Sequence, residues 1–139
     1  MNIENKRAIT SNREKIDWFL KALVAVANKT NWEGLPITLN VNGLIISGYL
    51  VSGREFFENL FEGQTEDSLP GIKEIIDDLY PDSAGKDEEE QDSLPAYIHL
   101  RDARIHHPGQ PPIPIDKGVY WRGCLEGVNG FCFGVSGVK

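Results

Sequence analysis

The feature that most constrains the fold is an Asn42-Gly43 pair between two runs of β-forming residues. Before the pair, apolar Ile, Leu and Val alternate with Thr and Asn, which is the period of a strand with one buried face. Asn and Gly both tolerate the positive φ that a two-residue hairpin turn requires. The sequence therefore predicts a β-hairpin over residues 36–52, and Gly48 within its second strand predicts a bulge or sharp bend.

An amphipathic helix is expected ahead of the hairpin. Between residues 16 and 27, apolar side chains recur at the i, i+3, i+4 and i+7 spacing of one helix face. Ser11 begins a capping-box pattern, which marks a helix start. We therefore predict a helix over residues 12–28, whereas the polar residues 1–10 are expected to be loose.

Residues 53–95 differ in character and are expected to form an insertion within the sheet. Apolar residues at 56–61 and again at 72–79 have helical spacing, so two short helices are predicted. Residues 82–92 are dominated by Asp and Glu and have no apolar period. Such a charge run is typical of a solvated, mobile loop.

Three more strands are predicted after the insertion. They cover residues 97–106, 118–125 and 131–135, with an irregularity at Asp102-Ala103 and a turn at Asn129-Gly130. A helix followed by five short, bent strands predicts a single α+β domain over residues 1–139. The expected architecture is a small five-stranded antiparallel barrel, Sm-like or SH3-like, with the insertion between strands 2 and 3. This is a fold analogy, and it assigns no function.

Charge limits the classes of partner. The chain has 139 residues and a formal net charge of −7. Nucleic-acid binding and adhesion to anionic lipid both need clustered Lys and Arg, so neither is expected. No run approaches the ~20 apolar residues of a membrane span, and the N-terminus has no apolar signal core.

The histidines and cysteines form no pattern of metal ligands or catalytic groups. His106 and His107 are adjacent, so on a strand they point to opposite faces, and we expect them and His99 to be solvated. Cys124 and Cys132 lack a CxxC spacing and are expected to be reduced, buried as small hydrophobes. Whether the two cysteines ever pair stays open. We therefore predict a non-enzyme without metal or cofactor.

Three segments resemble a known family. They are LNVNGLIISGYLVSGREFFENL (residues 39–60), YIHLRDARIHH (97–107) and GVYWRGCLEGVNGFCFG (118–134). Together they are similar to the U-type gas vesicle accessory proteins (the GvpU family). The resemblance covers roughly residues 36–61 and 96–136 and leaves the insertion unaligned.

The resemblance implies a cytoplasmic, gas vesicle-associated protein without catalytic residues. It implies a minor, non-shell component that acts through protein–protein contacts in vesicle assembly or vesicle clustering. The implied partners are the vesicle shell, other vesicle accessory proteins, or a second copy of the chain. An alternative from another class is an Sm-like RNA-binding protein or other small adaptor, which the acidic balance disfavours.

Apolar surface on the 54–80 segment, backed by the open edge of the barrel, is the candidate contact site. Neighbouring residues on a helix lie about 100° apart, so Phe56 and Phe57 cannot both face inward. Exposed apolar patches commonly mark protein contacts. The alternative is that both helices cover the barrel and bury these side chains. The candidate contact residues are Phe56, Phe57, Phe61, Ile72, Ile76 and Leu79.

Overall fold

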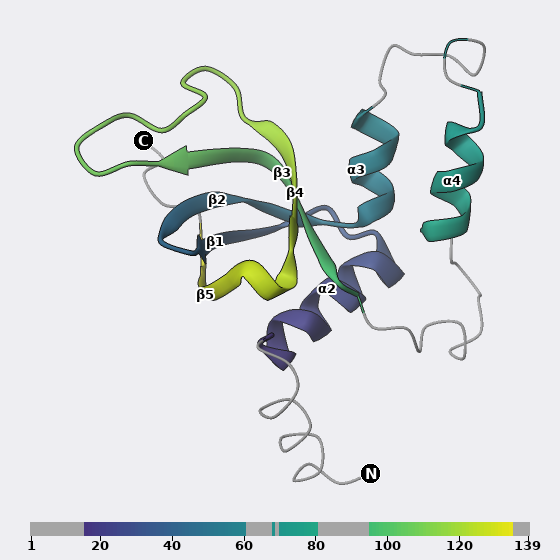
Figure 1. Ribbon diagram of the computed structural model, residues 1–139, viewed down its shortest axis with the longest axis horizontal. Coiled ribbons are helices and arrows are strands. Elements are labelled where there is room, and N and C mark those ends of the chain that lie inside the picture. Colours follow the sequence, from purple (N-terminus) through teal and green to yellow (C-terminus); the bar gives the residue numbers. More distant parts are fainter. Residues whose placement is uncertain (1–15, 61–67, 69, 81–94, 135–139) are drawn as a thin grey trace, which may run out of the picture.

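The computed structural model describes residues 16–60, 68, 70–80 and 95–134. The predictions for residues 1–10 and 82–92 lie outside these ranges. The described elements are α2 (Trp18–Thr30), β1 (Leu35–Val41), β2 (Leu44–Val51), α3 (Gly53–Leu60), α4 (Ile72–Leu79), β3 (Tyr97–His106), β4 (Val119–Cys124), the 3-10 helix η2 (Leu125–Gly127) and β5 (Val128–Phe133). Helix α2 lies along the sheet, while α3 and α4 stand side by side beyond it (Figure 1).

The five strands form one antiparallel sheet in the order β4-β3-β2-β1-β5. The α+β class is therefore confirmed, but the barrel is not, because β4 and β5 occupy the two ends of this order and the sheet stays open. Only the three residues of η2 connect these edge strands, so the sheet curls until its edges come together at that corner. The turn predicted at Asn129-Gly130 is wrong, since both residues lie within β5.

The hairpin prediction is confirmed. Val41 pairs with Leu44, and the two residues between them have positive φ, 53° at Asn42 and 92° at Gly43. The side chain of Asn40 accepts a hydrogen bond of 2.8 Å from the Gly43 N–H. The turn is thus fixed by residues that belong to the turn itself or lie next to it.

The irregularity predicted at Asp102-Ala103 is also confirmed. Asp102 has a φ of 56°, and the register of β3 shifts there against both β2 and β4. Gly48 lies opposite this bulge, where a Cβ would come within 3.0 Å of the Arg101 carbonyl oxygen. The Asp102 carboxylate accepts a 2.9 Å hydrogen bond from the Gly118 N–H, which ties the bulge to the start of β4.

Helix α2 begins later than predicted. Asp17 is its N-cap, with extended φ and ψ of −64° and 120°, and its carboxylate accepts from two backbone N–H groups of the first turn. The start predicted at residue 12 is therefore wrong, because the helix that contains the predicted apolar face begins only after the extended residue Asp17. The capping box at Ser11 lies outside the described residues.

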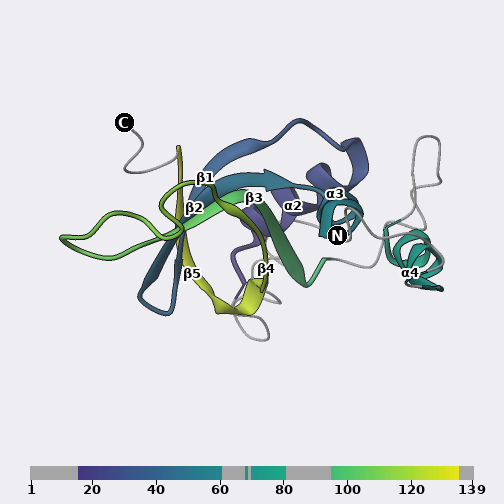
Figure 2. The same ribbon diagram turned by 90° about the horizontal axis from the view of Figure 1, so that it is seen from above.

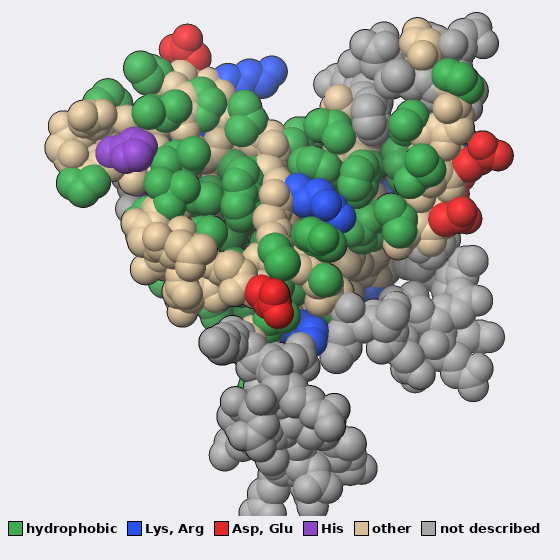
Figure 3. All heavy atoms as spheres, in the orientation of Figure 1, with side chains coloured by type: hydrophobic (Ala, Val, Ile, Leu, Met, Phe, Trp, Pro, Cys, Tyr) green, Lys and Arg blue, Asp and Glu red, His purple; other side chains and the backbone are tan. Residues whose placement is uncertain are grey.

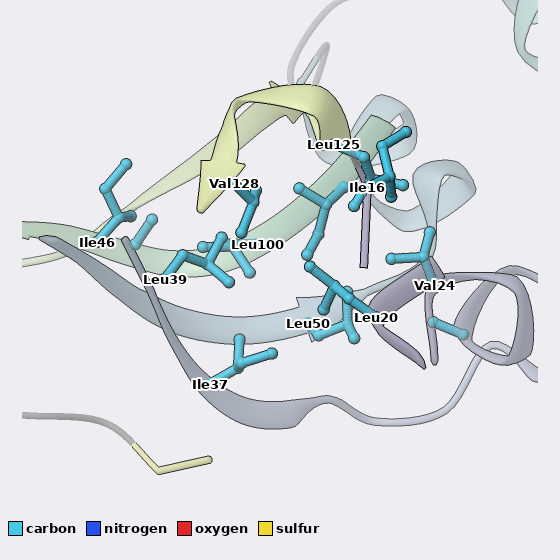
Figure 4. Packing of buried hydrophobic residues seen from close by; sticks show 13 residues of the cluster. Ile16, Leu20, Val24, Ile37, Leu39, Ile46, Leu50, Leu100, Leu125 and Val128 are labelled. Atoms are coloured by element: carbon cyan, nitrogen blue, oxygen red, sulfur yellow. The ribbon is translucent and has the colours of Figure 1, made fainter. Parts of the chain in front are cut away.

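The core lies between α2 and the concave side of the sheet (Figure 4). Alternate residues of β1, β2 and β3 point to this side, as their period of two requires. The largest fully buried apolar side chains are Leu20, Val24, Ile37, Leu39, Ile46, Leu50, Val51, Ile98, Leu100 and Leu125. One face of the sheet is thereby covered by α2, which leaves the insertion to cover part of the other.

Candidate functional site

The insertion helices carry the candidate contact residues. Helix α4 is the outermost element and lies alongside α3 (Figures 1 and 2). Phe61 lies outside the described residues. The other five candidates divide by burial into buried Phe56 and Ile76, half-buried Phe57 and Ile72, and exposed Leu79. Phe56 and Ile76 therefore hold the insertion together, and the outer side of α4 is left to face solvent.

Exposed apolar side chains occur on both insertion helices. Ile75 and Leu79 lie one helical turn apart and are 53% and 57% exposed, and Leu60 at the end of α3 is 48% exposed. Ile72 lies on the same stripe of α4, because residues at i, i+3 and i+7 share a helix side. We call Leu60, Ile72, Ile75 and Leu79 the insertion face. Figure 3 shows hydrophobic side chains gathered over the region of these two helices.

A buried histidine on β3 packs against the insertion. Ile98 and Leu100 point into the core, so His99 between them points to the opposite side of β3, where it is fully buried against α3 and Tyr80. Its ring centroid lies 5.1 Å from that of Phe56 and 5.5 Å from that of Tyr80, which follows α4. We call His99 and the rings of Phe56, Phe57 and Tyr80 the His99 cluster.

Arg122 on β4 contacts the His99 cluster through both a hydrogen bond and ring contacts. Its Nε donates a 3.1 Å hydrogen bond to His99 Nε2, so the proton of the neutral imidazole is on Nδ1. The guanidinium also lies 3.8 Å above the centroid of the Tyr97 ring and 5.4 Å from that of Phe57. Burial, and secondarily the charge of Arg122, lowers the pKa of His99 to about 3. His99 is therefore uncharged at neutral pH.

The expectation that the histidines are solvated is thus wrong for His99, because α3 packs over its side of β3. His106 is half-buried, with its Nε2 2.7 Å from Ser47 Oγ, and His107 is exposed. The spacing of Ile98, His99 and Leu100 assigned His99 to the non-core face. Nothing in that local pattern showed that the insertion would cover this face.

Arg54 joins α3 to α4. Its guanidinium lies 3.0 Å from carboxylate oxygens of both Glu58 and Asp77 and donates to the Tyr80 carbonyl at 2.9 Å. The hydrogen bond from Arg54 is the main cause that lowers the pKa of Asp77. A single, mostly buried guanidinium thus holds partners from both helices, which sets the position of α4.

A second polar contact joins α3 to the sheet. Glu55 Oε2 accepts hydrogen bonds from Arg101 Nη1 at 3.0 Å and from the Tyr120 hydroxyl at 2.9 Å. These donors come from β3 and β4, so α3 is anchored across two strands. These contacts fix the position of the helices that carry the insertion face relative to the sheet.

The cysteines lie elsewhere and differ from expectation. Cys124 and Cys132 are both free and both exposed, so the prediction that they are buried hydrophobes is wrong. Cys132 alternates with Phe131 and Phe133 along β5, and Phe131 packs against the core. Cys132 therefore points to the other side of the sheet.

In the described part of the chain, no group of three His, Cys, Asp or Glu side chains could hold a metal ion. Nor does any helix there have the length and apolar character needed to span a membrane. The candidate site is therefore an exposed apolar face on two helices that are joined to each other and to the sheet by polar contacts. Exposed apolar surface of this kind is suited to contact with another macromolecule.

Comparison with known proteins identifies the family. A protein-family model described as "Gas vesicle protein GvpU-like" matches residues 17–136. Neither a curated protein nor a solved structure matches the chain. The match runs from the N-cap of α2 to beyond the end of β5 and so includes the insertion that the sequence resemblance left unaligned. Because it spans most of the 139 residues, the chain belongs to the GvpU-like family of gas vesicle proteins.

Proposed function

We propose that this chain is a non-enzymatic accessory protein that binds gas vesicle components through the insertion face. Family membership supports a gas vesicle role. The main support for this surface is that Ile75 and Leu79 are exposed on α4, which Arg54 and the His99 cluster hold in place. A fixed apolar face loses little conformational entropy when a partner covers it.

The charges around the insertion face define the partner's chemistry. Glu74, Asp77 and Asp78 are exposed on α4 beside the apolar stripe, and Glu58 is exposed on α3. A complementary surface would be apolar at its centre with basic residues at its rim. We propose that a vesicle shell protein or another vesicle accessory protein carries this surface, and that the chain acts in the cytoplasm in vesicle assembly or clustering.

Co-flotation with purified gas vesicles tests the proposal. The test variant is Ile75→Glu/Leu79→Glu, and the matched control is Ile113→Glu/Ile115→Glu, which adds the same charge at exposed apolar residues of the β3–β4 connection. Covering the exposed halves of two aliphatic side chains contributes about 2 kcal/mol, so the test variant is expected to bind about thirtyfold more weakly.

Both variants should melt close to the wild type, because each of the four side chains is about half exposed or more and none belongs to the core cluster. The control is expected to float with the vesicles as the wild type does. Equal flotation of the test variant and the wild type would contradict the proposal. Loss of flotation in both variants would also contradict it, because added charge rather than this face would then govern binding.

A further inference from the structure

Strand β5 is an edge strand without the usual protection. Among the described residues it pairs with β1 alone, and no charged residue or proline occurs from Val128 to Gly134. Edge strands commonly carry charges, prolines or covering elements that prevent pairing with other chains. The opposite edge strand, β4, has Arg122 and contacts α3. The exposed, uncharged edge of the sheet is therefore β5.

The register identifies the backbone groups on this free edge. The Gly134 N–H donates to the Pro36 carbonyl at 2.9 Å, so these two residues form a hydrogen-bonded pair. In the same register, Ile37 lies opposite Phe133 and Leu39 lies opposite Phe131. Inward and outward hydrogen-bonding positions alternate along an antiparallel strand. The N–H and C=O groups of Phe131 and Phe133 therefore point away from β1, toward the free side.

Aromatic side chains extend the core to the same edge. Ring centroids follow one another at 6.1 Å from Trp18 to Phe19, 6.3 Å from Phe19 to Phe131, and 5.7 Å from Phe131 to Phe133. Trp18, Phe19 and Phe133 are 59%, 45% and 56% exposed. This aromatic row joins the start of α2 to β5 and is distinct from the insertion face.

We propose that a second copy of the chain pairs with β5, antiparallel and in a register centred on Cys132. In this register the outward groups of Phe131 meet those of the partner's Phe133, and the reverse pair completes four backbone hydrogen bonds. Both aromatic rows then lie on one side of a continuous sheet. The inference goes beyond the proposed function and does not depend on vesicle binding.

Charge and area favour a second copy as the occupant. Each chain carries a net charge of −7, so two copies can approach most readily at a segment without charge. Aromatic side chains bury roughly 150–250 Å² each, so three half-exposed rings per copy supply about 600 Å² in total. That is about half of the roughly 1,200 Å² that a small stable interface buries, and the two strand edges add to it. The dimer is therefore expected to be weak and to strengthen as salt screens the net charge.

Cys132 provides a position-specific reporter of this register. At the two-fold centre it faces the partner's Cys132 as a non-hydrogen-bonded pair, for which Cα atoms lie about 4.5 Å apart. That separation is within the range of about 4.4–6.8 Å that a disulfide spans. Cys124 is also exposed but lies on β4, so it serves as a matched control.

Cross-linking of the full chain with copper phenanthroline tests the register. The wild type and Cys124→Ser are expected to give a disulfide-linked dimer, and Cys132→Ser is expected to give none. Sedimentation should show a wild-type dimer at high protein concentration and moderate salt, and Phe133→Glu should raise its dissociation constant at least tenfold.

Three results would overturn the proposal: a wild type that stays monomeric at every concentration and salt, cross-linking that requires Cys124, or an unchanged dimer in Phe133→Glu. If Phe133→Glu fails to fold, the two serine variants still decide, because both replace exposed side chains. The insertion-face variant Ile75→Glu/Leu79→Glu should dimerise normally, so failure of vesicle binding and failure of dimerisation are separable.

Discussion

Acidification should destabilise this fold through His99. The imidazole is fully buried among aromatic rings, and burial together with Arg122 lowers its pKa to about 3, against an ordinary value of 6.5. The unfolded chain therefore binds a proton at mildly acidic pH while the folded chain does not. Stability from this group is fully present above pH 6.5 and is lost as pH falls from 6.5 toward 3.

The magnitude follows from the two pKa values. Between pH 7 and pH 5 the His99 contribution falls by about 2 kcal/mol, and it falls by roughly 4 kcal/mol in all by pH 3. A typical domain has a free energy of unfolding of about 5–15 kcal/mol, so the loss at pH 5 is large enough to measure.

Denaturant unfolding at pH 7 and pH 5, followed by the fluorescence of the three tryptophans, measures this loss. The control is His99→Gln, which keeps an acceptor for Arg122 but cannot ionise. The wild type is expected to lose about 2 kcal/mol more than His99→Gln over this interval. Equal losses in the two proteins would refute the reasoning, because they would show that His99 is protonated as easily in the folded state as in the unfolded one.

Two further predictions concern the Arg54 contact between α3 and α4 and the bulge at Asp102. Arg54→Met should increase the rate of amide exchange throughout α4 about tenfold. The control Lys73→Met removes only an exposed ion pair and should leave this rate unchanged. Equal exchange rates in the two variants would contradict the role of Arg54 in joining α3 to α4. Gly118→Ala should lower the free energy of unfolding by about 2 kcal/mol, since its Cβ would collide with the Asp102 backbone. Gly130→Ala meets open space and should cost well under 1 kcal/mol, and matching thermal melts of the two variants would refute the steric argument.

Local backbone requirements account for what the sequence alone determined. The hairpin at Asn42-Gly43 and the bulge at Asp102-Ala103 were predictable, because positive φ and a period of two depend on adjacent residues. The bounds of β3 followed from the same alternation. The start of α2 did not, since apolar spacing continues across Asp17 and only the observed backbone shows that the helix begins after it.

Tertiary structure alone decided which side chains are covered. His99 is buried because α3, which is distant in sequence, packs over its side of β3. Cys132 is exposed because the strand order places β5 at an edge, with Phe131 directed to the core side. The spacing of Phe56, Ile75 and Leu79 identified helix faces but could not say which face would meet the protein and which would meet solvent. Burial depends on what packs against a residue, and for this chain the decisive neighbours come from distant segments.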